Sequence, residues 1–106
     1  LRRQQSSILI QLRTGHVALA KHLNRIKKND NPNCPHCRLR GRNELETVRH
    51  FILDCPSYSR ERFRMQRELG RDASSLKILL GDEKGVKTLL RYIGQTRRLE
   101  KSFGDV

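Results

Sequence analysis

The chain has 106 residues, of which 35% are hydrophobic, so it has room for a single domain with a modest apolar core. Its 23 Lys and Arg residues against 11 Asp and Glu residues give a formal net charge of +12, which predicts a polyanionic partner. Nucleic acid is the first expectation, and an acidic protein surface or a membrane surface is the alternative. No apolar run approaches the ~18 residues of a membrane span, and the first residues lack a signal peptide's apolar stretch, so we expect an intracellular protein, nuclear or cytoplasmic, without a membrane partner.

The first predicted element is an N-terminal helical hairpin over residues 7–29. Its first helix carries the apolar run ILIQL and is expected to break at Thr14 and Gly15. Its second helix is expected from about Val17 to Lys28. An i, i+4, i+7 spacing of apolar positions supports it: Leu19, Leu23 and Ile26. Another face of this helix is basic and supplies candidate phosphate contacts: Lys21, Arg25 and Lys28. The segment NDNPN, residues 29–33, is a turn cluster that leads into the next element.

The next element, residues 34–55, contains all 3 cysteines of the chain. An odd number of cysteines and an intracellular setting argue against a disulfide framework. The pattern C-x2-C-x12-H-x4-C supplies three thiolates and one imidazole, which is a tetrahedral donor set of a closed structural Zn²⁺ site. The predicted ligands are Cys34, Cys37, His50 and Cys55. We therefore predict one structural zinc ion in a knuckle formed by this segment.

Local signals within the knuckle predict how these ligands are presented. Pro35 stiffens the turn between the first two cysteines, and Thr47 has the position of an N-cap for a short helix that stops before Pro56. Between them lies a flexible basic loop whose arginines are further candidate phosphate contacts: Arg38, Arg40 and Arg42. The apolar residues of the short helix must pack outside the knuckle: Phe51, Ile52 and Leu53.

Other interpretations of the cysteines and histidines are weaker. Free cysteine is a common small buried hydrophobe, but Pro, His and Arg surround this C-x-x-C. A redox C-x-x-C belongs beside a strand–helix unit, which the sequence does not predict, and zinc would occupy both groups of a Cys–His nucleophile pair. A DNA-reading finger shares the spacing but needs an aromatic residue and a leucine where this chain has Gly41 and Thr47. His36 is expected to be exposed, and His16 and His22 to have core or surface roles rather than to bind metal.

A helix is predicted from Pro56 to Gly70, and its charge pattern is the most informative in the chain. At about 100° per residue, one face is expected to lie on the core: Tyr58, Arg62, Met65 and Leu69. Four arginines share the opposite face: Arg60, Arg64, Arg67 and Arg71. The alternative is a merely solvated face, but such faces normally mix signs, and here Glu61 and Glu68 lie on a flank. We therefore predict that this stripe contacts phosphates.

The remaining sequence predicts two more helices. Ser74 and Ser75 cap the run LKILL, Gly81 ends it, and Asp82 begins a longer helix. The core side of this longer helix is expected to contain Val86, Leu89, Leu90 and Ile93. The same helix is expected to carry four basic residues: Arg91, Arg97, Arg98 and Lys101. No Gly-rich phosphate loop, Ser-His-Asp set or spaced carboxylate trio occurs, so we predict neither an enzyme nor a small-molecule substrate.

Several stretches together resemble a known family. They are LRTGH at 12–16, CPHC at 34–37, ETVRHFILDCPSY at 46–58 with Arg62, SLKILLG at 75–81 and LLRYIGQTRRL at 89–99. Over about residues 7–103 the chain resembles the C-terminal zinc-binding tail of non-LTR (LINE-type) retrotransposon polyproteins, especially fungal ones. The main departure is the basic insertion from Arg38 to Asn43.

The resemblance implies a tail that follows a reverse transcriptase, often with an RNase H domain, and whose cysteine–histidine motif binds nucleic acid during target-primed reverse transcription. It also implies the same four zinc ligands. The acidic catalytic residues of the upstream enzymes have no counterpart in this chain, so the resemblance implies no polymerase activity here.

Together these observations predict a mainly α, small helical domain organised around one structural zinc knuckle. The predicted domain spans residues 1–106, with the hairpin at 7–29, the knuckle at 34–55 and C-terminal helices at 57–103. Its predicted function is zinc-dependent, non-catalytic binding of RNA or DNA through backbone contacts. The alternative is a zinc-stabilised scaffolding module that docks on an acidic protein surface, for which the parent polymerase domain is a candidate.

Overall fold

The computed structural model describes residues 2–104 and confirms the mainly α-helical fold class. No β-strand occurs among these residues, and one isolated antiparallel bridge pairs Asn33 with Leu45. In the same part of the chain, no helix combines the length and the hydropathy that crossing a membrane requires.

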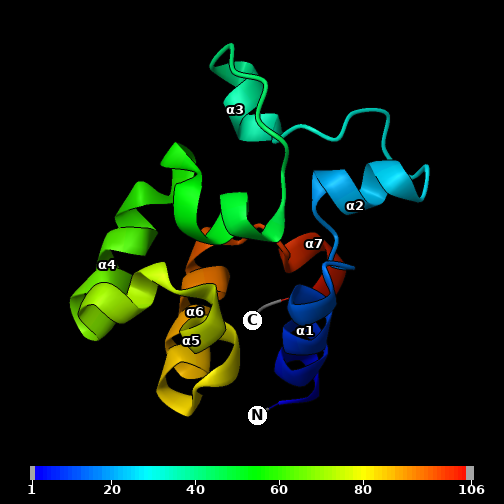
Figure 1. Ribbon diagram of the computed structural model, residues 1–106. Helices are drawn as coiled ribbons and strands as arrows, with labels where there is room; N and C mark the ends of the chain where they lie inside the picture. The colour runs from blue at the N-terminus through cyan, green and yellow to red at the C-terminus, as the bar shows by residue number, and fades with distance from the viewer. Residues whose placement is uncertain (1, 105–106) are drawn as a thin grey trace.

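The helices in chain order are α1 (Arg3–Thr14), α2 (Ala20–Arg25), α3 (Pro35–Leu39), α4 (Ser59–Leu69), α5 (Leu76–Gly81), α6 (Glu83–Thr96) and α7 (Glu100–Phe103). Between them lie a π-helical turn, η1 (His50–Asp54), and two 3-10 turns, η2 (Pro56–Tyr58) and η3 (Gly70–Ser74). Figure 1 shows α1, α5 and α6 grouped in the lower part of the molecule, with α4 on one flank and α3 standing out at the top.

Helix α6 is the centre of the core. Both α4 and α5 pack against it, and α1 packs against α5. The predicted core positions of α6 are all buried: Val86, Leu89, Leu90 and Ile93. Its N-cap is Asp82, whose carboxylate accepts the Gly85 N–H, and Ser75 caps α5 in the same way, as predicted. Periodicity and caps therefore predict α5 and the start of α6 correctly. The predicted last helix is too long, because α6 ends at Thr96 where Arg97 turns the chain with φ 58°, so Arg98 and Lys101 lie beyond it.

The apolar residues after His50 pack outside the knuckle, as predicted. Phe51 and Ile52 are wholly buried, and the Phe51 ring lies 5.5 Å from that of Tyr58 and 5.7 Å from that of Tyr92. The Tyr92 hydroxyl donates to the Phe51 carbonyl oxygen at 2.6 Å. These contacts fasten the π-helical turn to α6.

Arg62 lies on the core face of α4, where the helical spacing predicts it, and it is 8% exposed. Its Nε donates to the Ile52 carbonyl oxygen at 2.9 Å, and its Nη2 donates to the Tyr92 hydroxyl oxygen at 3.3 Å. Two backbone carbonyl oxygens and a phenol oxygen thus accept hydrogen bonds from this buried guanidinium. Burial of the same donors without partners would be costly in free energy.

The predicted second helix is too long. Helix α2 spans Ala20–Arg25, whereas the spacing predicts a helix from about Val17 to Lys28. Leu19 is extended (φ −105°, ψ 157°) and 1% exposed, while Lys27 has a φ of 61° and Ile26 is 47% exposed. The helix starts late because Leu19 enters the core from extended backbone, and it stops early at the left-handed Lys27. The apolar spacing reports burial of Leu19 correctly but not its backbone conformation.

Gly85 permits the close approach of α5 and α6. A Cβ at this position would fall far inside van der Waals contact with the carbonyl oxygen of Ile78, which is rigid backbone. Gly85→Ala is therefore expected to destabilise the fold by ~1–3 kcal/mol, as overpacking does.

The matched control is Gly81→Ala, where an added Cβ meets nothing within 4 Å at the end of α5. This change is expected to be neutral or to stabilise by up to about 1 kcal/mol. Urea unfolding midpoints of the two variants measure the difference. Equal midpoints would contradict the close helix approach.

Candidate metal centre

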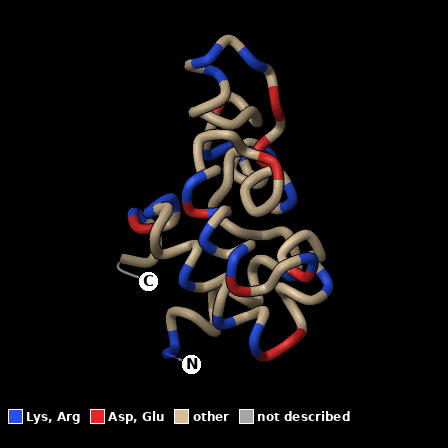
Figure 2. Tube along the Cα trace, turned by 90° about the vertical axis from the view of Figure 1, so that its left-hand side faces the viewer, with Lys and Arg blue, Asp and Glu red and all other residues tan. Residues whose placement is uncertain are grey.

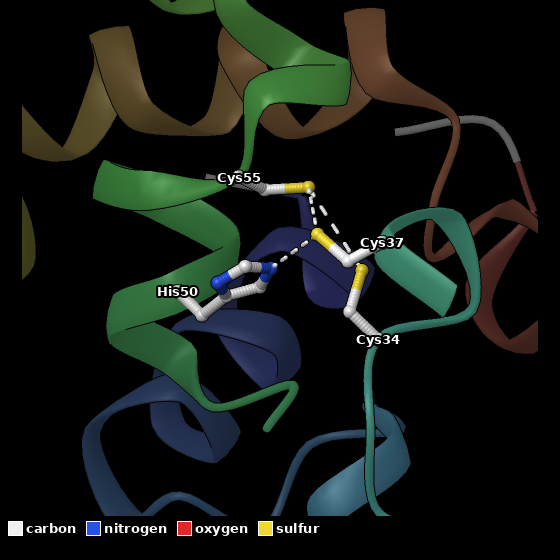
Figure 3. A group of neighbouring side chains, drawn as sticks. All are labelled: Cys34, Cys37, His50 and Cys55. Carbon is white, nitrogen blue, oxygen red and sulfur yellow. Dashed lines mark hydrogen bonds between the residues drawn. The ribbon is translucent and has the colours of Figure 1, made fainter. Parts of the chain in front are cut away.

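The side chains of Cys34, Cys37, His50 and Cys55 converge on one point, and together they could hold a metal ion. Their donor atoms all lie within 4.8 Å of one another, and all four residues are buried. The Sγ atoms of Cys34 and Cys55 are 3.8 Å apart, those of Cys37 and Cys55 are 4.0 Å apart, and Cys37 Sγ lies 3.4 Å from His50 Nε2. Figure 3 shows the three sulfur atoms and the imidazole facing a common centre. The cysteines are free thiols rather than disulfide partners.

The first two cysteines are held by a short loop whose arms are hydrogen-bonded together. The Cys34 N–H donates to the Glu44 carbonyl oxygen at 2.7 Å, and the Glu46 N–H donates to the Pro32 carbonyl oxygen at 3.0 Å. Pro35 is the first residue of α3, where its missing N–H costs nothing. Cys34 therefore precedes this one-turn helix and Cys37 lies within it, which directs both thiols to the same side.

The other two ligands come from the π-helical turn. Thr47 Oγ1 accepts the His50 N–H at 3.0 Å, which confirms the predicted N-cap, and the Cys55 N–H donates to the His50 carbonyl oxygen at 2.7 Å. In a regular α-helix, residues five apart point about 140° away from each other. An i→i+5 bond instead brings Cys55 over His50. The wide turn allows an H-x4-C spacing to place both side chains in one site. The sequence predicts a short helix here but not its π-helical form.

Burial controls the chemistry of these thiols. Desolvation by burial, with the nearby Cys55 sulfur adding to it, raises the pKa of Cys34 to about 12 and also raises the pKa of Cys37. Without a cation both groups are therefore neutral thiols at neutral pH, and a bound metal ion would displace their protons. Buried thiols with a raised pKa are poor nucleophiles, so the geometry suits metal binding rather than thiolate catalysis.

The remaining histidines lie outside this group. His36 is exposed, as expected, and its ring forms a T-shaped pair with that of Tyr58, with centroids 5.5 Å apart. His16 and His22 stack on each other with centroids 5.2 Å apart. The spacing-based choice of His50 as the fourth ligand thus agrees with the observed cluster.

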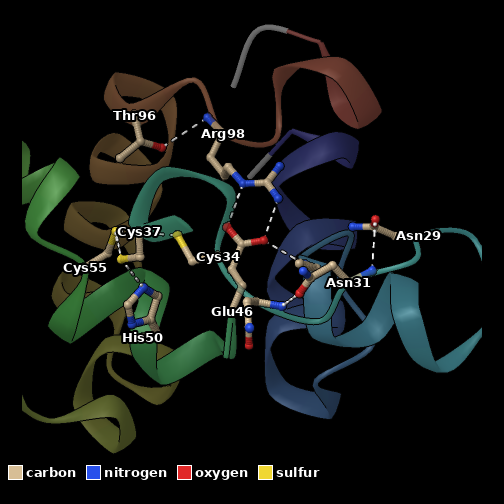
Figure 4. Close-up of polar contacts among 11 residues, drawn as sticks. Asn29, Asn31, Cys34, Cys37, Glu46, His50, Cys55, Thr96 and Arg98 are labelled. Atoms are coloured by element: carbon tan, nitrogen blue, oxygen red, sulfur yellow. Dashed lines mark hydrogen bonds and ion pairs between the residues drawn. The ribbon is translucent and has the colours of Figure 1, made fainter. Parts of the chain in front are cut away.

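A buried ion pair, which the sequence pattern does not predict, lies beside the cluster. Glu46 is 1% exposed, and its carboxylate accepts the Ala20 N–H at 2.6 Å and the Arg98 Nε–H at 2.8 Å. Arg98 also donates through Nη2, so the pair is two-pronged. Figure 4 shows the Arg98 guanidinium set against the Glu46 carboxylate next to the cysteines. The pair joins the knuckle, the start of α2 and the segment that follows α6.

All of the predicted phosphate contacts are exposed: Lys21, Arg25, Lys28, Arg38, Arg40, Arg42, Arg60, Arg64, Arg67 and Arg71. None of these side chains forms an ion pair with Asp or Glu within residues 2–104. The ion pairs of that range use other cations: Arg49, Lys87, Arg91, Arg97 and Arg98. The predicted stripe is one residue shorter, because α4 ends at Leu69 and Gly70 turns the chain with φ 60°. Arg71 therefore lies in η3 and not on the helical face of the other three arginines.

Comparisons of the chain with protein-family models, with curated proteins and with solved structures found no significant match.

Proposed function

We propose that this chain is a zinc-dependent, non-catalytic nucleic-acid-binding module that contacts the phosphate backbone of RNA or DNA. The observation that carries the proposal is that the predicted phosphate contacts are exposed and have no acidic partner within residues 2–104, in a chain that also has a buried Cys3His cluster. The net charge of +12 favours a polyanion over a neutral ligand.

Zinc is the metal that the donor set favours. Three thiols and one imidazole are typical of closed structural Zn²⁺ sites, where metal–sulfur bonds are about 2.3 Å. A regular tetrahedron with such bonds has sulfur–sulfur edges of about 3.8 Å. The spacings of 3.8 and 4.0 Å to Cys55 Sγ are close to that edge length. The bound ion would neutralise the buried thiolates and hold α3 against the π-helical turn.

The distribution of charge and aromatic residues favours backbone contact over base reading. Figure 2 shows Lys and Arg positions spread along the tube from top to bottom of the view, with acidic positions between them. Tyr58, Tyr92 and Phe51 are buried, so they are not free to stack on bases, whereas Phe63 is 59% exposed. Contacts between Lys or Arg side chains and the phosphate backbone supply affinity without sequence specificity.

The resemblance to the tails of non-LTR retrotransposon polyproteins adds a biological setting to the proposal. In that setting the module would follow a reverse transcriptase and hold RNA, DNA or their hybrid for it. The alternative function is a zinc-stabilised scaffold whose exposed cations dock on an acidic protein surface, including the parent polymerase domain.

Binding across a salt series distinguishes these two functions and gives the first expected result. The zinc-loaded chain is titrated against single-stranded RNA, duplex DNA and an acidic protein. With about five phosphate contacts, log K against log salt should fall with a slope of about −4 to −5 on duplex DNA and somewhat less on single strands. Replacing three arginines of α4, in the variant Arg60→Gln/Arg64→Gln/Arg67→Gln, should flatten that slope by about three units.

The matched control, Lys87→Gln/Arg91→Gln/Arg97→Gln, removes the same charge from cations that already have acidic partners. It should change the slope much less, and thermal midpoints should move little because each surface change is expected to alter stability by only about 0.5 kcal/mol. If both triple variants weaken binding equally, net charge alone acts and α4 is not a binding face. Tight binding to the acidic protein alone would favour the scaffold.

A further inference from the structure

A basic cleft of about 290 Å³ is lined on one side by α2 and the connection that precedes it, and on the other by residues 46–49. The residues that matter for its chemistry are Gly15, Lys21, His22, Arg25, Thr47 and Arg49. The cleft is distinct from the cysteine cluster, none of whose members line it.

The charge inside the cleft is positive. Lys21, Arg25 and Arg49 contribute cations, and within residues 2–104 only Arg49 of these has an acidic partner, Asp54, at a loose 3.8 Å. Glu46 is the one acidic residue of the lining, and its carboxylate is already committed to Arg98 and to the Ala20 N–H. The wall therefore offers an anion unpaired positive charge from Lys21 and Arg25.

His22 supplies a second, independent observation. Its Nδ1 atom is buried and has no hydrogen-bond partner in the described part of the chain. Buried polar atoms are nearly always paired, and leaving one unpaired is costly. His22 lines the cleft, and a turn of its ring would bring this nitrogen within reach of a ligand oxygen, because in the observed position the atom exposes almost no surface to water.

We propose that this cleft binds a phosphate group, and that in the working protein the group is a backbone phosphodiester of the bound nucleic acid. The cleft is at the low end of volumes that enclose a whole drug-sized ligand, whereas a single phosphate with part of its sugar needs less room. Lys and Arg donors with one imidazole suit phosphate oxygens. The phosphodiester assignment rests on the proposed nucleic-acid function, but the phosphate chemistry of the cleft stands without it.

The test titrates inorganic phosphate and then a short RNA into the isotope-labelled, metal-loaded chain and follows amide and imidazole NMR signals. Both ligands are expected to shift Gly15, His22 and Arg49. In Lys21→Gln/Arg25→Gln the phosphate-induced shifts should disappear, and the salt slope for RNA should flatten by about two units. The matched control is Lys77→Gln/Lys101→Gln, which removes two exposed charges outside the cleft. It should keep the shifts and most of the slope. Metal content and thermal midpoint show that each variant is folded.

The outcomes separate this inference from the proposed function. RNA binding that is equal in the two double variants, with no shift of the cleft signals, would overturn the cleft while leaving nucleic-acid binding intact. Cleft shifts with phosphate but not with RNA would overturn the phosphodiester assignment and identify a site for a free phosphate compound. If no nucleic acid binds, the proposed function fails and the phosphate titration still decides the chemistry of the cleft.

Discussion

Replacement of Cys37 by serine is expected to release the metal ion and to unfold most of the chain. Cys37 is wholly buried, and its Sγ lies beside both Cys55 Sγ and His50 Nε2, so its loss removes a central donor. Metal binding contributes an apparent ~10–16 kcal/mol in small zinc domains at neutral pH, which is comparable to or larger than the entire stability of a domain this size. Metal analysis and helical circular dichroism measure the two effects.

The control for that experiment is His36→Ala, which changes an exposed imidazole one residue away. It should keep one metal ion per chain and nearly the parent dichroism. Addition of a chelator to the parent protein should reproduce the effect of Cys37→Ser. Persistence of the helical signal after complete metal removal would show that the core alone sustains the fold and that the cluster is not structural.

Neutralising Glu46 should have the second largest effect. Glu46→Gln leaves the Arg98 guanidinium, whose side chain is 19% exposed, without its counter-charge. Breaking one half of a buried ion pair typically costs ~3–5 kcal/mol, because the remaining charge stays desolvated and unpaired. The unfolding midpoint in urea, measured at a fixed zinc concentration, should fall accordingly.

An exposed ion pair provides the comparison for this change. Glu83 pairs with Lys87 on the surface of α6, and their side chains are 86% and 62% exposed. Glu83→Gln should therefore cost less than about 1 kcal/mol. The double variant Glu46→Gln/Arg98→Gln should cost less than the sum of its two single changes, since the partners are coupled. Equal midpoints for Glu46→Gln and Glu83→Gln would show that the buried pair stabilises the fold no more than the exposed pair does.

The parts of this structure that the sequence predicts are those with local causes. Helix boundaries at Gly15, Ser75 and Asp82 follow from turn and cap chemistry that acts within four residues. The four members of the cysteine–histidine cluster follow from ligand type and spacing, because few other functions need that combination. The core face of α6 follows from periodicity alone.

The parts that were missed depend on partners distant in the chain. The truncation of α2 depends on Leu19 entering the core and on Glu46 holding the Ala20 N–H. Nothing near Arg98 in the sequence marks it as half-buried, because its partner is 52 residues away. The π-helical turn has a signal that was not used: two ligands spaced H-x4-C cannot face one ion from a regular α-helix.

The burial of the three cysteines among the core side chains has a consequence for modularity. Cys34, Cys37 and Cys55 belong to the same packed cluster as Leu89 and Tyr92 of α6, rather than to a separate miniature core. The cluster residues 34–55 therefore do not form a finger that could be excised, transplanted to another protein or repeated in tandem. Metal release and melting of α6 should occur in one cooperative transition with a common midpoint.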